Sequence, residues 1–228
     1  MTNNEISLIG VLTVAALLPL ILASGSCYLK FSIVLVLVRN ALGIQQVPSN
    51  LALNSIALIM SLFVMMPVTE RAYHFLQDHQ VDVMDRQSLD DFVENGLGDY
   101  KRYLQRYSDP ELVKFFESVQ SGRIRNRKDE GDRDSGRTAD NLSDNSLFAL
   151  VPAYALSEIK SAFRVGFYLY LPFVVVDMVV STVLLALGMM MMSPVSISVP
   201  IKLILFVAID GWTHICKDLV MQYVQLMK

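Results

Sequence analysis

Four ionisable residues lie inside otherwise apolar stretches of the sequence: Lys30, Asp177, Lys202 and Asp210. A charged side chain at apolar depth in a bilayer costs about 2.5–3.5 kcal/mol, so we expect each to be paired or to face water. The connection before Lys202 is expected to end at Pro200, so the depths of Asp177 and Lys202 in a hairpin would differ by roughly 20 Å and an ion pair within one chain would be strained. The sequence therefore predicts an ion pair between neighbouring copies of the chain. The alternative for Lys202 is an ammonium group that reaches the membrane interface.

A run of four methionines, Met189, Met190, Met191 and Met192, follows directly after Gly188. The run covers a whole helical turn, so its side chains cannot all serve one packing face. Methionine is unbranched and polarizable, and it repacks around irregular shapes. A ring of such side chains from several copies would seal a pore and still yield to a passing chain. The alternative is that these methionines are ordinary lipid-facing residues.

Motifs for enzyme chemistry or nucleic-acid binding are missing from the sequence. There is no phosphate-binding glycine-rich loop, serine nucleophile elbow or histidine metal motif. The three histidines and two cysteines are too few and too scattered to suggest a metal centre. The net charge of -3, without a long basic run, argues against a nucleic-acid partner. We therefore predict a protein that is not an enzyme, with no catalytic residues, metal or cofactor.

The composition is that of a membrane protein. Of the 228 residues, 53% are hydrophobic and 18% are charged, against about 25% charged in an average soluble domain. Only 3 of the 41 charged residues precede Thr69, 32 lie within residues 70–164, and 6 follow. This distribution predicts an all-α protein in three parts. The parts are an apolar helical hairpin over 1–68, a polar helical region over 69–164 and a second apolar hairpin over 165–228.

Four apolar runs make up the two predicted hairpins. They cover Ile6–Val38, Leu51–Val68, Val165–Met192 and Ile197–Leu226. The first is long enough to span a bilayer by Cys27, and its helix is free to continue as far as Arg39. We expect Pro172 to break the third run. Two prolines in the uncharged connection 193–200 predict irregular backbone there.

The polar region shows helical patterns and one loop. Apolar residues at helical spacing predict a buried face formed by Tyr100, Tyr103, Leu104 and Tyr107, and Asp109 followed by Pro110 predicts the start of the next helix. Residues 121–145 are rich in Gly, Ser, Asp, Arg and Asn, which predicts a flexible loop. Arg39 at the end of the first run favours a cytoplasmic loop after it, and this orientation places the polar region outside.

Small residues in the apolar runs predict close helix contacts. Ala23, Ser24, Gly25 and Ser26 lie in the first run, and Gly166 opens the third. Such residues let two helix backbones approach each other in membranes.

The carboxy-terminal third of the chain resembles the SctR/FliP family, a core export-apparatus subunit of type III secretion systems and flagella. The matching strings are PAYALSEIKSAFRVGF (152–167), LPFVVVDMVV (171–180), Gly188 to Met192 with Pro194, and IKLILFVAIDGW (201–212). The match extends over about 60 residues, and the order of hairpin, polar region and hairpin agrees with the family along the whole chain.

The resemblance implies a homo-oligomer of five all-helical copies. These copies wind with one SctT-like and several SctS-like subunits into a closed conical assembly, which sits largely above the plane of the bacterial inner membrane, with the polar region on the periplasmic side. Met189 to Met192 match the gasket of the family's central channel, and Asp177 and Lys202 match its intersubunit charged positions. The sequence shows no cleaved leader of the flagellar kind, which favours the injectisome branch and a part in virulence.

We therefore predict a pore-forming structural subunit of the type III secretion export gate. Its implied partners are the other export gate components, the inner rod and needle proteins, unfolded secreted proteins and membrane lipid. The alternative is a small-solute or ion transporter subunit that uses Asp177 and Lys202 as a coupling site at a broken helix.

Overall fold

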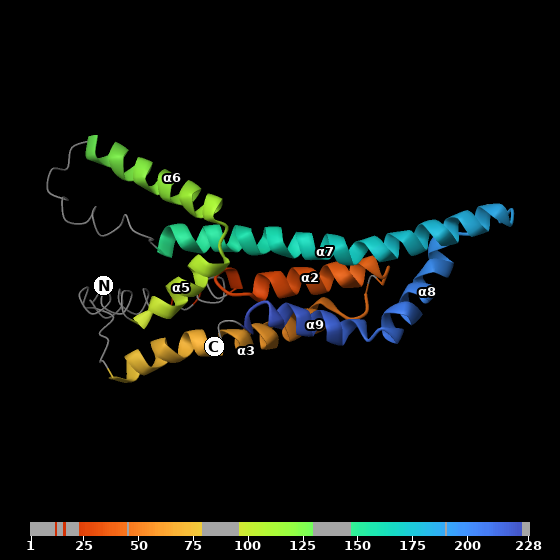
Figure 1. The fold of residues 1–228 in the computed structure, drawn as a ribbon, viewed down its shortest axis with the longest axis horizontal. Coiled ribbons are helices and arrows are strands. Elements are labelled where there is room, and N and C mark those ends of the chain that lie inside the picture. The colour runs from red at the N-terminus through yellow and green to blue at the C-terminus, as the bar shows by residue number, and fades with distance from the viewer. Residues whose placement is uncertain are drawn as a thin grey trace. The chain divides into compact units, whose positions relative to one another are not determined.

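The structure is a computed structural model that describes residues 12, 16, 23–44, 46–78, 96–129, 147–189 and 191–224. Within these ranges the chain forms helices and turns and no strand, which confirms the predicted all-α class. The helices are α2 (Tyr28–Ala41), α3 (Asn50–Asp78), α5 (Gly98–Tyr107), α6 (Pro110–Asp129), α7 (Leu147–Ala186), α8 (Pro194–Ala208) and α9 (Gly211–Met221) (Figure 1).

The chain divides into two compact units. The first unit consists of Met1–Leu29 and Val68–Glu158, and the second of Lys30–Pro67 and Ile159–Lys228. The boundaries between the units fall inside α2, α3 and α7. The second unit contains most of α2, most of α3, most of α7, and the helices α8 and α9.

Helix α2 begins at Tyr28, so the prediction of one helix running through to Arg39 is wrong. The backbone leaves the helix at Gly25–Cys27. Gly and Ser are weak helix formers, and here the Gly25 carbonyl accepts a hydrogen bond from the Tyr100 hydroxyl (3.0 Å) instead of relying on a helical partner. Residues 6–11, 13–15 and 17–22 of the first apolar run lie outside the described residues.

Helices α2 and α3 are connected through residues 42–49, of which all but residue 45 are described. Gly43 has a φ of 79°, the left-handed conformation that commonly ends a helix, and Ser49 caps α3 by accepting the Ala52 N–H (3.2 Å). Arg39 crosses the turn, where its Nη1 donates to the Pro48 carbonyl (3.1 Å) and to Asn50 Oδ1 (2.6 Å). Inside the hairpin, Ser32 donates to Asn54 (2.8 Å). These contacts hold the two helices antiparallel.

The structure differs from two predicted interruptions, one in the third apolar run and one in the polar region. Helix α7 continues through Pro172, because a proline removes a single helical N–H while the turns on either side keep their ladders. Helix α6 begins where Asp109 and Pro110 predict it, with Asp109 Oδ1 accepting the Glu111 N–H (3.1 Å). It then runs on to Asp129, since Arg and Lys are good helix formers, so the predicted loop does not begin at 121. Residues 130–146 lie outside the described part of the chain.

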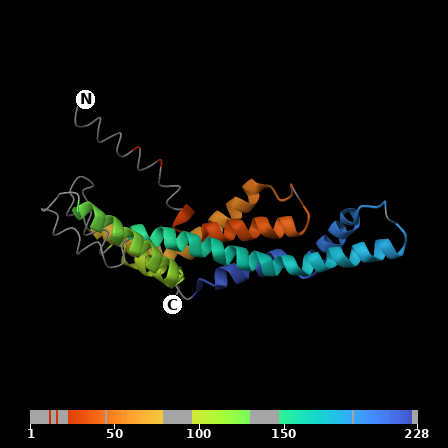
Figure 2. The same ribbon diagram turned by 90° about the horizontal axis from the view of Figure 1, so that it is seen from above.

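Close packing in the second unit depends on a small residue. A Cβ atom at Gly166 would lie 2.3 Å from Leu37 Cδ1, so α7 approaches α2 at a distance that only glycine permits. The two helices run alongside each other there in both views (Figures 1 and 2). The prediction of a close contact at Gly166 is confirmed.

Among the described residues, two helical segments are long and apolar enough to cross a membrane: Asn50–Glu70 and Leu147–Ala186. A third candidate is the pair Pro194–Ala208 and Gly211–Met221, which is bent by 60°. The second and third apolar runs therefore fall on helices long enough to span a membrane, whereas the fourth run falls on two helices joined by a bend.

Candidate functional site

The methionine run lies in the connection between α7 and α8. Helix α7 ends with two hydrogen bonds, from Gly188 N to the Leu185 carbonyl (3.0 Å) and from Met189 N to the Leu184 carbonyl (3.0 Å). This pair of bonds, with Gly188 at a φ of 71°, is a Schellman motif. It satisfies the last carbonyls of α7 and ends the helix at a defined residue directly before the methionines.

The described methionines of this connection are exposed in the single chain. Met191 is fully exposed, and Met189 and Met192 keep 40% and 43% of their surface. Met190 lies outside the described residues. The described methionines follow the end of α7 and do not form the expected helical turn, and Met191 lies on no packing face of the single chain. A sealing role for the run stays a prediction.

The prolines of the connection do not produce irregular backbone. Pro194 is the first residue of α8, where its missing N–H is not needed by the helix, and Pro200 lies inside α8. The predicted irregular segment 193–200 is therefore wrong except at Ser193. Helix α8 therefore starts six residues before Pro200, and this moves Lys202 relative to Asp177.

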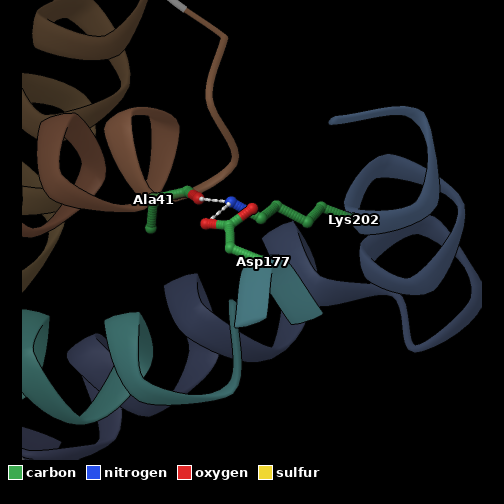
Figure 3. A network of polar contacts seen from close by, with 3 residues as sticks. All are labelled: Ala41, Asp177 and Lys202. Carbon is green, nitrogen blue, oxygen red and sulfur yellow. Dashed lines mark hydrogen bonds and ion pairs between the residues drawn. The ribbon is translucent and has the colours of Figure 1, made fainter. Parts of the chain in front are cut away.

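Asp177 and Lys202 form an ion pair within one chain (Figure 3). Lys202 Nζ lies 2.5 Å from Asp177 Oδ2 and donates a second hydrogen bond to the Ala41 carbonyl at the end of α2 (3.3 Å). Asp177 lies nine residues before the end of α7, and Lys202 lies eight residues after the start of α8. At about 1.5 Å per residue, both are about 12–14 Å along their helices from the connection. The expectation that an intrachain pair would be strained is wrong, because Pro200 lies inside the helix.

The pair is buried unequally. The Lys202 side chain keeps 6% of its surface and the Asp177 side chain keeps 43%. One carboxylate and one backbone carbonyl therefore neutralise and hydrogen-bond a lysine that has almost no access to solvent. The arrangement joins α7, α8 and α2 close to the methionine connection. Whether Asp177 also faces a neighbouring copy stays a prediction.

The other two ionisable residues of the apolar runs have separate environments. Lys30 is buried in α2, with its Nζ 5.1 Å from the centre of the Tyr223 ring, within the range of a cation–π contact. Asp210 is exposed at the junction of α8 and α9, and its Oδ1 accepts a hydrogen bond from the Thr213 hydroxyl (2.9 Å). Neither belongs to the Asp177–Lys202 pair.

Sequence reasoning found a buried tyrosine face but not its hydrogen bonds. In the first unit, Tyr103 is fully buried and its hydroxyl hydrogen-bonds to that of Tyr154 from α7. The Tyr103 ring packs against Tyr100, Tyr107 and Tyr154, with centroids 6.3, 5.3 and 5.2 Å away. The spacing of α5 predicted which residues face inward. It carried no signal for the Tyr154 or Gly25 partners, 51 and 75 residues away.

Burial changes the acidity of these tyrosines. Loss of hydration raises the pKa of Tyr100 from 10.0 to about 12. The same cause raises the pKa of Tyr103 far above its usual range, and the pKa of Tyr107 is raised as well. The cluster is thus a set of neutral hydroxyls that joins α5 to α7 and, through Tyr100, to the backbone at Gly25.

A metal centre is not found in the described part of the chain, where no three His, Cys, Asp or Glu side chains gather in a way that could hold an ion. The candidate site therefore consists of an exposed methionine connection and the ion pair that fixes the two helices beside it.

Comparison with known proteins assigns a family to this arrangement. The model of the FliP family matches residues 11–219. Surface presentation of antigens protein SpaP of Salmonella typhimurium is 57% identical over 224 residues, which cover 98% of this chain and 99% of that protein. Yop proteins translocation protein R of Yersinia pestis is 43% identical over 220 residues, with coverages of 96% and 97%. Harpin secretion protein HrcR of Erwinia amylovora is 36% identical over 208 residues, with 91% of each chain covered. The chain, whose residues 152–212 resemble the SctR/FliP pattern, belongs to the FliP family.

Proposed function

We propose that this protein is a pore-forming structural subunit of a type III secretion export gate. It assembles as a homo-oligomer of five copies with SctS-like and SctT-like subunits in the bacterial inner membrane. Its polar region lies on the periplasmic side, and unfolded proteins pass through its centre toward the inner rod and needle. Membership of the FliP family supports this proposal, as do the secretion and translocation roles in the names of its relatives.

The observation that carries the proposal is the exposed methionine connection between α7 and α8. In one chain Met191 has no cover at all, although methionine is a residue of protein interiors. The Schellman motif and the Lys202 ion pair hold the helices on either side of the connection. Flexible thioether side chains on a fixed support suit a seal, because they pack around different shapes without moving the backbone.

Five copies of this connection around one axis would form a closed apolar ring. Such a ring excludes ions because an ion loses its hydration there and gains no polar partner. An unfolded chain opens the ring by displacing the side chains, and no bond has to break. The energy for transport comes from other components, so the subunit needs no catalytic residues.

A leak measurement tests this proposal. We expect M190A/M191A to raise ion leakage through the assembled complex in vesicles several-fold, because alanine leaves the ring open. The matched control is M178A, since Met178 on α7 is also exposed (64%) but lies away from the connection. Equal conductance of wild type, the double variant and the control would contradict the seal.

The contacts of Lys202 do not favour the small-solute or ion transporter that the sequence left open. A coupling site has to bind and release an ion, whereas the Lys202 ammonium is buried and held by Asp177 and the Ala41 carbonyl. A transporter would show flux linked to protons or sodium when the chain is reconstituted alone. We expect none from an export gate subunit.

A further inference from the structure

The junction between α8 and α9 changes the direction of the chain at a single residue. The two helices meet at 60°, with only Ile209 and Asp210 between them (Figure 1). Asp210 has φ 51° and ψ 46°, the left-handed conformation, and no other non-glycine residue in the described ranges has a positive φ. Asp is one of the few residues besides glycine that adopt this conformation readily. The bend is therefore local and specific to this position.

Hydrogen bonds at Asp210 complete both helices. Its N–H donates to the Val207 carbonyl (3.0 Å), which closes the last turn of α8. Its own carbonyl accepts the His214 N–H (3.1 Å), the first helical bond of α9, and its carboxylate accepts the Thr213 hydroxyl. One residue thus ends the first helix and begins the second, so the bend costs few backbone hydrogen bonds.

Packing on the inner side of the bend requires the next residue to be glycine. A Cβ atom at Gly211 would lie 2.3 Å from Cε2 of the Phe206 ring. Phe206 is itself buried, in edge contact with Trp212 (5.3 Å between centroids) and against Phe173 of α7 (6.2 Å). The ring fills the angle between α8 and α9 and connects it to α7.

The helices on both sides of the bend are anchored to α2. On the α8 side, Lys202 donates to the Ala41 carbonyl. Beyond the end of α9, the Tyr223 ring packs edge-on against Phe31 (5.7 Å) and lies under Lys30 (5.1 Å). The angle at Asp210 decides whether these two anchors can form together.

We propose that Asp210 and Gly211 form a fixed elbow that sets the angle of α8 and thereby holds the connection 187–193 in place. Both are positioning residues: Asp210 supplies the left-handed turn, and Gly211 makes room for the Phe206 ring. The consequence for a channel seal rests on the proposed function, whereas the elbow itself does not.

Distances between spin labels in the full chain test the elbow. Labels on S196C in α8 and M221C in α9, in a background with C27A and C216A, would be about 33 Å apart across a 60° bend and about 38 Å apart along one straight helix. We expect the otherwise native chain to give a single narrow distribution at the shorter distance. A broad distribution, or one centred on the longer distance, would overturn the proposal.

Two variants separate backbone conformation from side-chain chemistry. D210G keeps a positive φ accessible, and we expect it to leave the mean distance unchanged. D210A/G211A favours a continuous helix, and we expect it to lengthen the distance by about 5 Å. An unchanged distance in the double variant would contradict the elbow. If that variant does not fold, the distance distributions of the native elbow sequence and of D210G still decide whether the junction of α8 and α9 has a fixed bend.

Secretion by the same variants distinguishes this inference from the proposed function. We expect a variant with a lengthened distance to lose most of its secretion and D210G to retain it. A lengthened distance with normal secretion would still agree with the proposed elbow, because the bend would have been lost with the two residues. It would instead contradict the role of the connection in the export gate.

Discussion

The tyrosine cluster of the first unit and the ion pair of the second unit bury polar groups in opposite ways. In the cluster, Tyr103 and Tyr154 satisfy each other as neutral hydroxyls surrounded by aromatic rings. In the pair, a buried ammonium depends on one carboxylate that is itself partly exposed. A neutral hydroxyl that loses its partner costs about 1–3 kcal/mol, whereas a buried charge that loses its partner costs about 3–5 kcal/mol. We therefore expect the second unit to be the more sensitive to loss of one group.

The largest effect is expected for D177A. Among the described residues it leaves the buried Lys202 ammonium with only the Ala41 carbonyl as a partner. We expect the unfolding free energy to fall by about 3 kcal/mol, the low end of the range for a broken buried pair, because Asp177 is partly hydrated. The measurement is unfolding of the purified chain in mixed detergent. Native mass spectrometry of the complex follows assembly, which we expect to weaken.

The matched variant is K202M, which removes the charge and keeps the apolar stem. We expect a loss of about 1 kcal/mol, because water can hydrate the remaining carboxylate of Asp177. An equal loss in both variants would contradict the asymmetry, and intact complexes with D177A would contradict the expected effect on assembly.

A smaller effect is expected in the tyrosine cluster. Y103F and Y154F each remove the hydrogen bond between the two buried hydroxyls, so we expect each to cost about 1–2 kcal/mol. The double variant removes both hydroxyls and should cost less than the sum of the two. Y168F is the control, because Tyr168 is exposed on α7 (64%) and should not change stability. Additive losses would mean that the two hydroxyls do not stabilise each other.

A further loss of stability is expected at alkaline pH. Tyr100 has a pKa of about 12 in the folded protein against 10.0 for an ordinary tyrosine, so it stabilises the fold fully below pH 10. That contribution is lost as the pH rises from 10 to about 12. We expect ultraviolet titration to show late ionisation that Y100F reduces, and the near-ultraviolet dichroism to decline over the same range. Ionisation of every tyrosine near pH 10 would contradict burial of the cluster.

The sequence by itself determined the helical class and the apolar runs. It also determined the helix start at Pro110. These features are local: they depend on the period of apolar residues, on capping side chains and on residues within one or two turns. The inward face of α5 was predictable for the same reason.

Only the tertiary structure decided how polar groups are paired. The Ala41 carbonyl that receives Lys202 is 161 residues away in the sequence, and the pairing with Asp177 depends on whether α8 starts at Pro194 or after Pro200. A proline is compatible with a helix start or with an interruption, and the surrounding packing chooses between them. The bend at Asp210 likewise depends on the Phe206 ring and on anchors in α2, because a left-handed residue is stable only where its neighbours hold it.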